Sequence, residues 1–138
     1  MTSTPSDSAQ IDQLVQAFFS VFTCKDGQLP DLSRLYALCL PEAVIACHSP
    51  QGTTVYSLES FIAPRQALFA SGRLTDFQEQ EDSADTQITG GIASRHCRYS
   101  KAGLMEGQPF TGRGTKYLHF VKMDKGWRIS SVVWQDDI

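Results

Sequence analysis

The clearest hydrophobic pattern in this chain lies in its last quarter, between Gly112 and Trp134. Two runs rich in β-branched and aromatic residues flank Asp124-Lys125-Gly126, and this arrangement predicts a β-hairpin closed by a tight turn. Each run carries apolar side chains at both odd and even positions, whereas a sheet that is wetted on one side alternates more cleanly. We therefore expect both faces of this hairpin to be covered.

Three segments of the first half have the spacing of helices. Apolar residues recur every three or four positions in residues 11–25, which predicts an amphipathic helix. Asp31 is placed to cap a second helix, and Pro41 is expected to end it. A third apolar stripe in residues 57–72 predicts another helix, with a kink or break at Pro64 because proline removes a helical hydrogen bond.

The remaining segments are rich in strand-forming residues and are bounded by turn residues, which is typical of β-strands. Gly90-Gly91 and the stretch from Ala102 to Gly107 are expected to be turns. The strands that we expect are, in order, residues 43–49, 53–56, 74–89, 92–100, 112–123 and 127–134.

The order of these elements predicts the fold class. Residues 1–9 are small and polar, which predicts a disordered tail before a single domain at residues 10–138. Helix, helix, strand, helix and then a run of strands is the order of an α+β fold. We expect a curved antiparallel sheet that is wrapped around three N-terminal helices. A chain of 138 residues is long enough to bury its own core.

Composition is that of an ordinary globular protein. Hydrophobic residues make up 41% of the chain, and no apolar run is long enough to span a bilayer. The sequence does not open with a signal peptide, so we expect a cytoplasmic protein with no membrane partner. The four cysteines form no C-x-x-C pair, and we expect them to be reduced and buried.

Charge is unevenly distributed, although the net charge is only −3. Residues 76–85 carry five acids and no base, whereas residues 95–128 carry eight bases against two acids. A nucleic-acid-binding protein is more often basic overall and places aromatic residues within its basic stripe. We therefore expect no nucleic-acid partner, and we predict that these acids and bases pair across neighbouring strands.

Three stretches of the sequence resemble the nuclear transport factor 2-like superfamily, in particular its ketosteroid-isomerase-like and polyketide-cyclase-like branch of mostly unassigned bacterial proteins. They are V-I-A-C-H-S-P-Q-G at residues 44–52, I-A-S-R-H-C-R-Y at residues 92–99, and G-R-G-T-K-Y-L-H-F-V-K-M-D-K-G-W-R-I-S-S-V-V-W at residues 112–134. The resemblance covers roughly residues 10–136 and implies a cone of bent sheet closed by three helices. Because the superfamily contains isomerases, dehydratases, cyclases, transport factors and non-catalytic assembly domains, it implies a fold more than an activity.

The resemblance also implies candidate catalytic residues. The isomerases carry a carboxylate base nine residues before the leading small residue of the third helix, and the same count back from Ser57 gives His48. Histidine can act as a base without any shift of its pKa. On the strand that corresponds to the isomerases' oxyanion donor, Tyr117 or His119 takes the equivalent position, and we expect one of them to donate to the developing oxyanion.

Ligand-binding candidates are expected on the inner wall of the cone. They are Phe18, Phe22, Phe61, Tyr99, Val132 and Trp134. The isomerases also take a tyrosine donor from the first helix, whereas this helix offers only phenylalanines there, which donate no hydrogen bond. The departure argues against steroid isomerisation itself. An alternative set resembles scytalone dehydratase, with His48 or His96 acting together with His119 and nearby tyrosines.

Two functions remain open from the sequence. The first is a protein that binds a small apolar molecule in a pocket, with cofactor-independent isomerase or dehydratase chemistry as its potential activity. The second is a non-catalytic binding or dimerisation module whose cone is filled by its own side chains. The three histidines lack the local spacing of metal ligands, so we expect neither a metal nor another cofactor. The two-sided apolar pattern of the closing hairpin predicts a homodimer.

Overall fold

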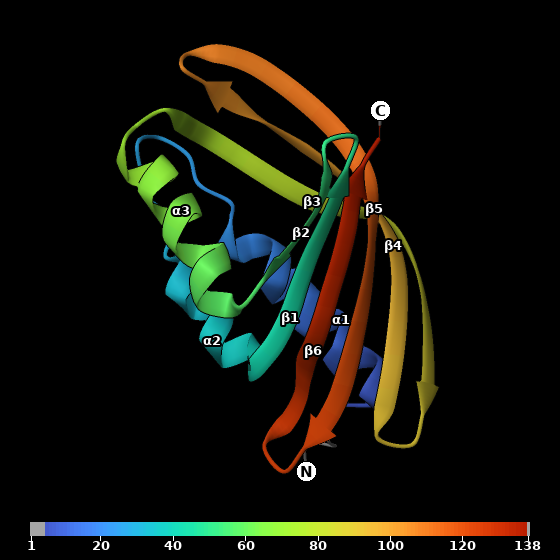
Figure 1. Cartoon of the computed structure of the whole chain (residues 1–138). Helices are drawn as coiled ribbons and strands as arrows, with labels where there is room; N and C mark the ends of the chain where they lie inside the picture. The colour runs from blue at the N-terminus through green and yellow to red at the C-terminus, as the bar shows by residue number, and fades with distance from the viewer. Residues whose placement is uncertain (1–4, 138) are drawn as a thin grey trace.

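A computed structural model describes residues 5–137 of the chain (Figure 1). Helices come first, and long strands make up most of the second half. The elements are α1 (Asp7–Val21), a short 3₁₀ helix η1 (Leu32–Arg34), α2 (Leu35–Leu38), β1 (Cys39–Ser49), β2 (Gly52–Tyr56), α3 (Leu58–Ala70), β3 (Leu74–Thr89), β4 (Ile92–Met105), β5 (Gln108–Met123) and β6 (Gly126–Asp136). None of the helices in the described part of the chain is long and apolar enough to cross a membrane.

The six strands form one curled sheet in the order β2-β1-β6-β5-β4-β3. Figure 1 shows the helices lying together on one side of this sheet, so that the curled strands and the helices enclose a cone. The α+β fold is therefore confirmed. The expectation of a purely antiparallel sheet needs one correction, because β1 pairs with β6 in parallel while the other neighbours are antiparallel.

Helix α1 begins earlier and ends earlier than the apolar spacing predicts. The hydroxyl of Ser6 accepts a hydrogen bond from the Ala9 amide at 3.1 Å, and this cap starts the helix at Asp7. Residues 7–9 are therefore helical and not part of a tail, while residues 1–4 of the predicted tail lie outside the described residues. The Asp7 carboxylate also accepts hydrogen bonds from Lys122 Nζ at 2.9 Å and Trp127 Nε1 at 3.0 Å, which fastens the start of α1 to β5 and β6.

The second predicted helix is much shorter than expected. Asp31 does cap it, since its carboxylate accepts from the Ser33 amide at 3.1 Å, but helical geometry ends at Leu38. Pro41 lies inside β1, where the register against β6 shifts between Cys39 and Val44. A proline has no amide hydrogen to donate, so it is tolerated where a ladder is already irregular.

Helix α3 is continuous through its proline. Ser57 and Ser60 form a reciprocal capping box at its start, and Pro64 lies in the middle of the thirteen-residue helix. The expected break is therefore absent. The guanidinium of Arg65 donates to the carbonyl oxygen of Phe61 at 3.1 Å, in the turn that precedes the proline ring.

Strands β4 and β5 are longer than predicted. Ala102 and Gly103 were expected in a turn, but they lie within β4, which pairs with β5 without interruption from Met105 and Gln108 down to Ile92 and Val121. The turn is confined to Glu106 and Gly107, both of which have a positive φ. The extra length lets the two strands arch over the cone, as Figure 1 shows.

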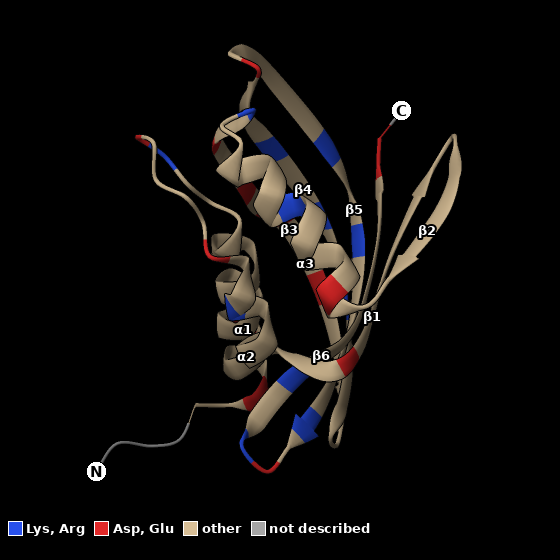
Figure 2. Ribbon diagram, turned by 60° about the vertical axis from the view of Figure 1, so that its left-hand side comes forward, with Lys and Arg blue, Asp and Glu red and all other residues tan. Residues whose placement is uncertain are grey.

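Charged side chains pair across neighbouring strands, as the charge distribution predicts. Figure 2 marks where the basic and acidic residues lie along the chain. Arg95 on β4 is only 7% exposed and donates to both carboxylate oxygens of Glu81 on β3, at 2.9 and 2.5 Å. The same guanidinium donates to Asp12 of α1 at 2.6 Å and to Thr86 at 3.0 Å. One buried arginine thus joins β4, β3 and α1. These partners raise its pKa, so the charge is retained in spite of the opposing effect of burial.

Replacing Arg95 with methionine should destabilise the protein by about 2 kcal/mol, because Glu81, which is 19% exposed, is left as a partly buried charge without its partner. The free energy of unfolding is measured by urea denaturation followed by circular dichroism. Arg73→Met is the matched control, since Arg73 and Glu106 form an exposed pair with exposed fractions of 60% and 62%. The control should lose less than about 1 kcal/mol. Equal losses in the two variants would contradict the structural role of Arg95.

Candidate functional site

A cavity of about 310 Å³ lies inside the cone, between the helices and the inner face of the sheet. Its wall is mostly aromatic and aliphatic, with a few polar groups among the apolar side chains. The apolar residues that line it are Phe18, Phe22, Ile45, Phe61, Leu68, Phe69, Leu74, Phe77, Val132 and Trp134, and the others are Cys47, Arg65, Glu79, Tyr99, Lys101, Lys116 and Asp136. All six residues proposed from the sequence as ligand-binding candidates are among them.

A buried ion pair crosses the inner face of the sheet. Lys116 on β5 is 7% exposed, and its Nζ lies 2.9 Å from a carboxylate oxygen of Glu79 on β3, which is 10% exposed. The same ammonium lies 4.0 Å from the centre of the Tyr99 ring and 5.1 Å from that of Trp134. Aromatic faces attract a cation. The lysine is therefore held by one carboxylate and two rings.

Tyr99, Lys101 and Asp136 form a second polar group in the lining of the cavity. Tyr99 is 1% exposed and donates a short hydrogen bond to one carboxylate oxygen of Asp136, while Lys101 donates to the other at 2.8 Å. Burial raises the pKa of Tyr99, and its bond to Asp136 raises it further. Burial alone would raise the pKa of Asp136, but the hydrogen bonds from Lys101 and Tyr99 lower it overall. At neutral pH the phenol stays protonated and the carboxylate stays ionised.

The third charged group stacks on aromatic rings. The guanidinium carbon of Arg65 lies 3.9 Å from the centre of the Phe61 ring, 4.9 Å from that of Tyr56 and 5.7 Å from that of Trp134. Tyr56 and Trp134 are themselves stacked with centroids 6.5 Å apart. The side chain is thus positioned by a box of three rings at the side of the cavity that α3 forms.

Two glycines make room for these side chains. The register of β4 against β5 is unbroken at Gly112 and Gly114, so neither glycine marks a β-bulge there. A Cβ on Gly114 would instead overlap the Tyr99 hydroxyl and lie 2.5 Å from the carbonyl oxygen of Gln135. A Cβ on Gly112 would lie 3.0 Å from Cε of Lys101. These glycines allow close approach of a neighbouring side chain, which is the other common reason for glycine in a strand.

The three predicted catalytic side chains point away from the cavity. Side chains alternate along a strand, and Cys47, Lys116 and Leu118 face inward, so the intervening positions face outward. His48 is exposed, and its Nδ1 lies 2.8 Å from the hydroxyl oxygen of Thr53. His119 is also exposed, and its Nδ1 lies 3.1 Å from the hydroxyl oxygen of Ser131.

Tyr117 is 53% exposed and stacks on His96 with the ring centroids 4.7 Å apart. The resemblance placed Tyr117 or His119 to within two residues, and an error of one residue moves a side chain to the opposite face of a sheet. All three histidines thus lie on the outer face, and none lines the cone. Within residues 5–137 there is no group of three or more His, Cys, Asp or Glu side chains that could hold a metal ion.

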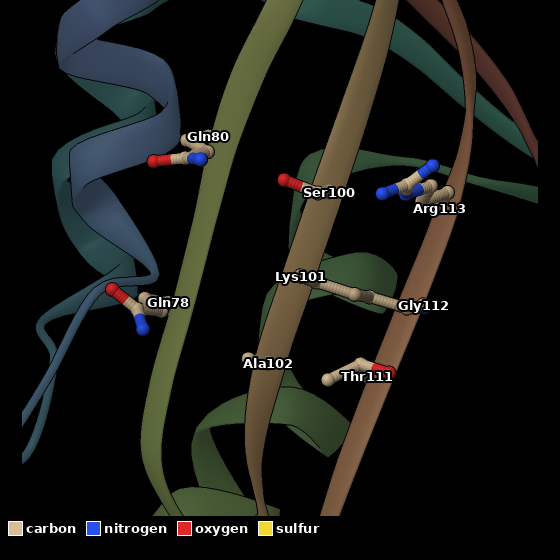
Figure 3. A pocket seen from close by; sticks show the side chains of 8 residues that line it. All are labelled: Gln78, Gln80, Ser100, Lys101, Ala102, Thr111, Gly112 and Arg113. Atoms are coloured by element: carbon tan, nitrogen blue, oxygen red, sulfur yellow. The ribbon is translucent and has the colours of Figure 1, made fainter.

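A second hollow, of about 550 Å³, lies against the outer face of the arching strands (Figure 3). In Figure 3 Gln80, Ser100 and Arg113 form one row across β3, β4 and β5, with Gln78, Ala102 and Thr111 in another. This hollow is larger than the cavity inside the cone, but it is open to solvent, since Gln78, Gln80 and Arg113 are exposed. Enclosure and apolar walls favour the cone as the candidate site.

The charged lining of the cone is the part that sequence reasoning missed. Glu79, Lys101, Lys116 and Asp136 all lie on strands at inward positions, where apolar residues are expected. The alternation did contain a hint, because Lys116 falls in phase with Leu118 and Phe120, which are 0% and 1% exposed. A lysine in phase with such residues is either buried with a partner or at a strand end.

Comparison with known proteins shows the fold. No protein-family model and no curated protein matches the sequence. A solved structure from Kribbella flavida is 15% identical, with a TM-score of 0.78 over 96% of this chain and 91% of that one. A nuclear transport factor 2-like superfamily protein from Salmonella enterica serovar Typhimurium is 14% identical, with a TM-score of 0.74 over 93% and 89%. A nuclear transport factor 2-like protein of unknown function from Silicibacter pomeroyi is 22% identical, with a TM-score of 0.67 over 99% and 100%. The chain thus has the nuclear transport factor 2-like fold.

Replacing Gly114 with alanine should destabilise the protein by about 1–3 kcal/mol, because the added methyl group overlaps the Tyr99 hydroxyl and a backbone oxygen. The change is measured by urea unfolding. Gly91→Ala is the matched control in the same sheet, where the nearest atom, Cβ of Lys122, lies at an ordinary 3.7 Å. The control should change by less than about 0.5 kcal/mol. A Gly114→Ala variant as stable as the control would show that Tyr99 is not held against this strand.

Proposed function

We propose that this chain is a small-molecule-binding protein that holds a small, largely apolar ligand in the cone. The observation that carries the proposal is the cavity of about 310 Å³ with its apolar wall and few convergent polar groups. In another protein an apolar cavity of about 150 Å³ holds a benzene ring. The cone therefore has room for a ligand of one or two rings. A module whose own side chains filled the cone would leave no such space.

Binding is better supported than proton transfer. A general acid or base works best when its pKa lies near the working pH. The shifts in the cone go the other way, since the pKa of Tyr99 is raised and that of Asp136 is lowered. His48, Tyr117 and His119 lie on the outer face. The side chains that the resemblance suggested as base and oxyanion donor therefore do not line the cavity of the cone.

We also propose that two copies of the chain pair through the outer face of the sheet. A row of side chains crosses four strands there, β2, β1, β6 and β5, and includes Tyr117, Val133 and Val55, with exposed fractions of 53%, 43% and 66%. Exposed apolar side chains that gather on one sheet face are typical of an interface. A two-fold dimer would cover this row with the same row of a second copy.

The ligand proposal is tested with two neighbouring positions of β6. Val132 is 1% exposed and lines the cone, whereas Val133 points outward and is 43% exposed. A panel of one- and two-ring compounds is titrated against the protein by ligand-observed NMR and calorimetry. Saturable one-site binding should weaken at least about tenfold in Val132→Phe, because the new ring occupies ligand space, and should be unchanged in Val133→Phe.

Leu68→Phe serves as a second cavity-filling variant, since Leu68 lies at the half-buried edge of the cavity on α3. Circular dichroism confirms that each variant folds. Absence of saturable binding by the whole panel, or equal weakening by the inner and outer variants, would exclude the cone as a binding site.

The dimer proposal is tested by light scattering. The unmodified protein at micromolar concentration should have twice the chain mass of 15.3 kDa. Tyr117→Glu should give the single-chain mass, because each copy would then bury an unpaired carboxylate in the interface. Leu29→Glu is the control, since Leu29 is 61% exposed but lies in the loop before η1. A monomer in the unmodified protein would rule out the dimer.

A further inference from the structure

The charges of the cone do not cancel. Three basic side chains line the cavity, and two have carboxylate partners: Lys116 pairs with Glu79 at 2.9 Å, and Lys101 pairs with Asp136 at 2.8 Å. The third is Arg65, which forms no salt bridge with any residue in the described part of the chain. The two acidic residues of the lining are thus each neutralised, and one positive charge is left over.

The left-over guanidinium is held in place but keeps most of its donors. Arg65 is half-buried and lies flat enough against Phe61 for its central carbon to be 3.9 Å from the ring centre. A guanidinium has five N–H donors, and the one hydrogen bond that Arg65 makes to another described residue goes to the Phe61 carbonyl oxygen. Its remaining donors are therefore not engaged by another described residue and are available on a side chain that lines the cavity. Preorganisation of this kind lowers the entropic cost of binding.

A cationic ligand is disfavoured at the same place. Three rings around a cation are the arrangement that recognises quaternary ammonium groups. Here Tyr56, Phe61 and Trp134 already surround the guanidinium of Arg65. A second cation would find these rings occupied and would meet a like charge.

We infer that the ligand of the cone is a monocarboxylic acid with an apolar body, bound as its carboxylate by Arg65. The inference rests on the proposed binding function and adds the charge and chemical class of the ligand. The two oxygens of a carboxylate match the planar fork of a guanidinium, and one negative charge balances the one surplus positive charge. The apolar body then lies along the wall formed by residues such as Phe22, Phe77 and Val132.

The test compares pairs of probes that differ only in charge. Benzoate and 2-naphthoate are titrated by calorimetry at neutral pH beside their neutral amides, benzamide and 2-naphthamide. At least one carboxylate should bind about tenfold or more tightly than its amide, because hydrogen bonds between charged groups are stronger than neutral ones. Added salt should weaken carboxylate binding and leave amide binding nearly unchanged.

Two substitutions locate the preference. Arg65→Gln, with Arg65→Met as a second variant in case the first does not fold, should reduce the carboxylate-to-amide ratio to about one. Arg113→Gln is the matched control, because it removes the same charge from the exposed hollow on the outer face and should retain the ratio. Circular dichroism and urea unfolding confirm that the variants keep the fold.

The possible outcomes separate this inference from the function on which it rests. If an amide and its carboxylate saturate the protein with equal affinity, the carboxylate assignment is overturned while binding in the cone stands. If a preference exists but survives in the Arg65 variants, the assignment of the anion to Arg65 is overturned. If no probe and no compound of the wider panel binds, both proposals are overturned.

Discussion

Burial of charge in matched pairs is the interaction on which this structure depends. Arg95 joins β4 to β3 and α1 through Glu81 and Asp12, and Lys116 joins β5 to β3 through Glu79. Such pairs are weak sources of stability, because desolvation offsets much of the attraction. Their geometry is nevertheless demanding, since a lone charge in the same place would cost several kcal/mol. They therefore fix where the edge strand β3 lies and, with it, the width of the cone.

The sequence predicted the fold well where patterns are local. The hairpin at Asp124-Lys125-Gly126, the strand at 74–89 and the helix after Ser57 all rest on turn or capping chemistry within a few residues. The errors arose where a contact with a neighbouring strand determines the local structure. Pro41 was predicted to end a helix, because nothing in the neighbouring sequence shows that the pairing of this segment with β6 is irregular and so tolerates a proline.

The site was predicted unevenly for the same physical reason. Apolar wall residues such as Phe61 and Val132 were found because burial leaves a periodic trace in the sequence. His48 and His119, which the resemblance suggested, lie on the outer face, because a resemblance does not determine which face of a strand a side chain occupies. The pairing of Lys101 with Asp136 joins positions 35 residues apart, and no local pattern predicts such a contact. The need for a glycine at position 114 comes from Tyr99 on another strand, and no local pattern reveals that contact.

The position of β6 between β1 and β5 has a consequence for how this sequence can change in evolution. Val132, Trp134 and Asp136 face the cone, while Val133 and Gln135 between them face outward, so a single layer of backbone separates the two surfaces. Point substitutions can alter one surface and leave the other intact. A one-residue insertion or deletion before Val132 would exchange them, placing Val133 in the cone and Trp134 outside. Divergence along this strand is therefore restricted to exchanges at constant length.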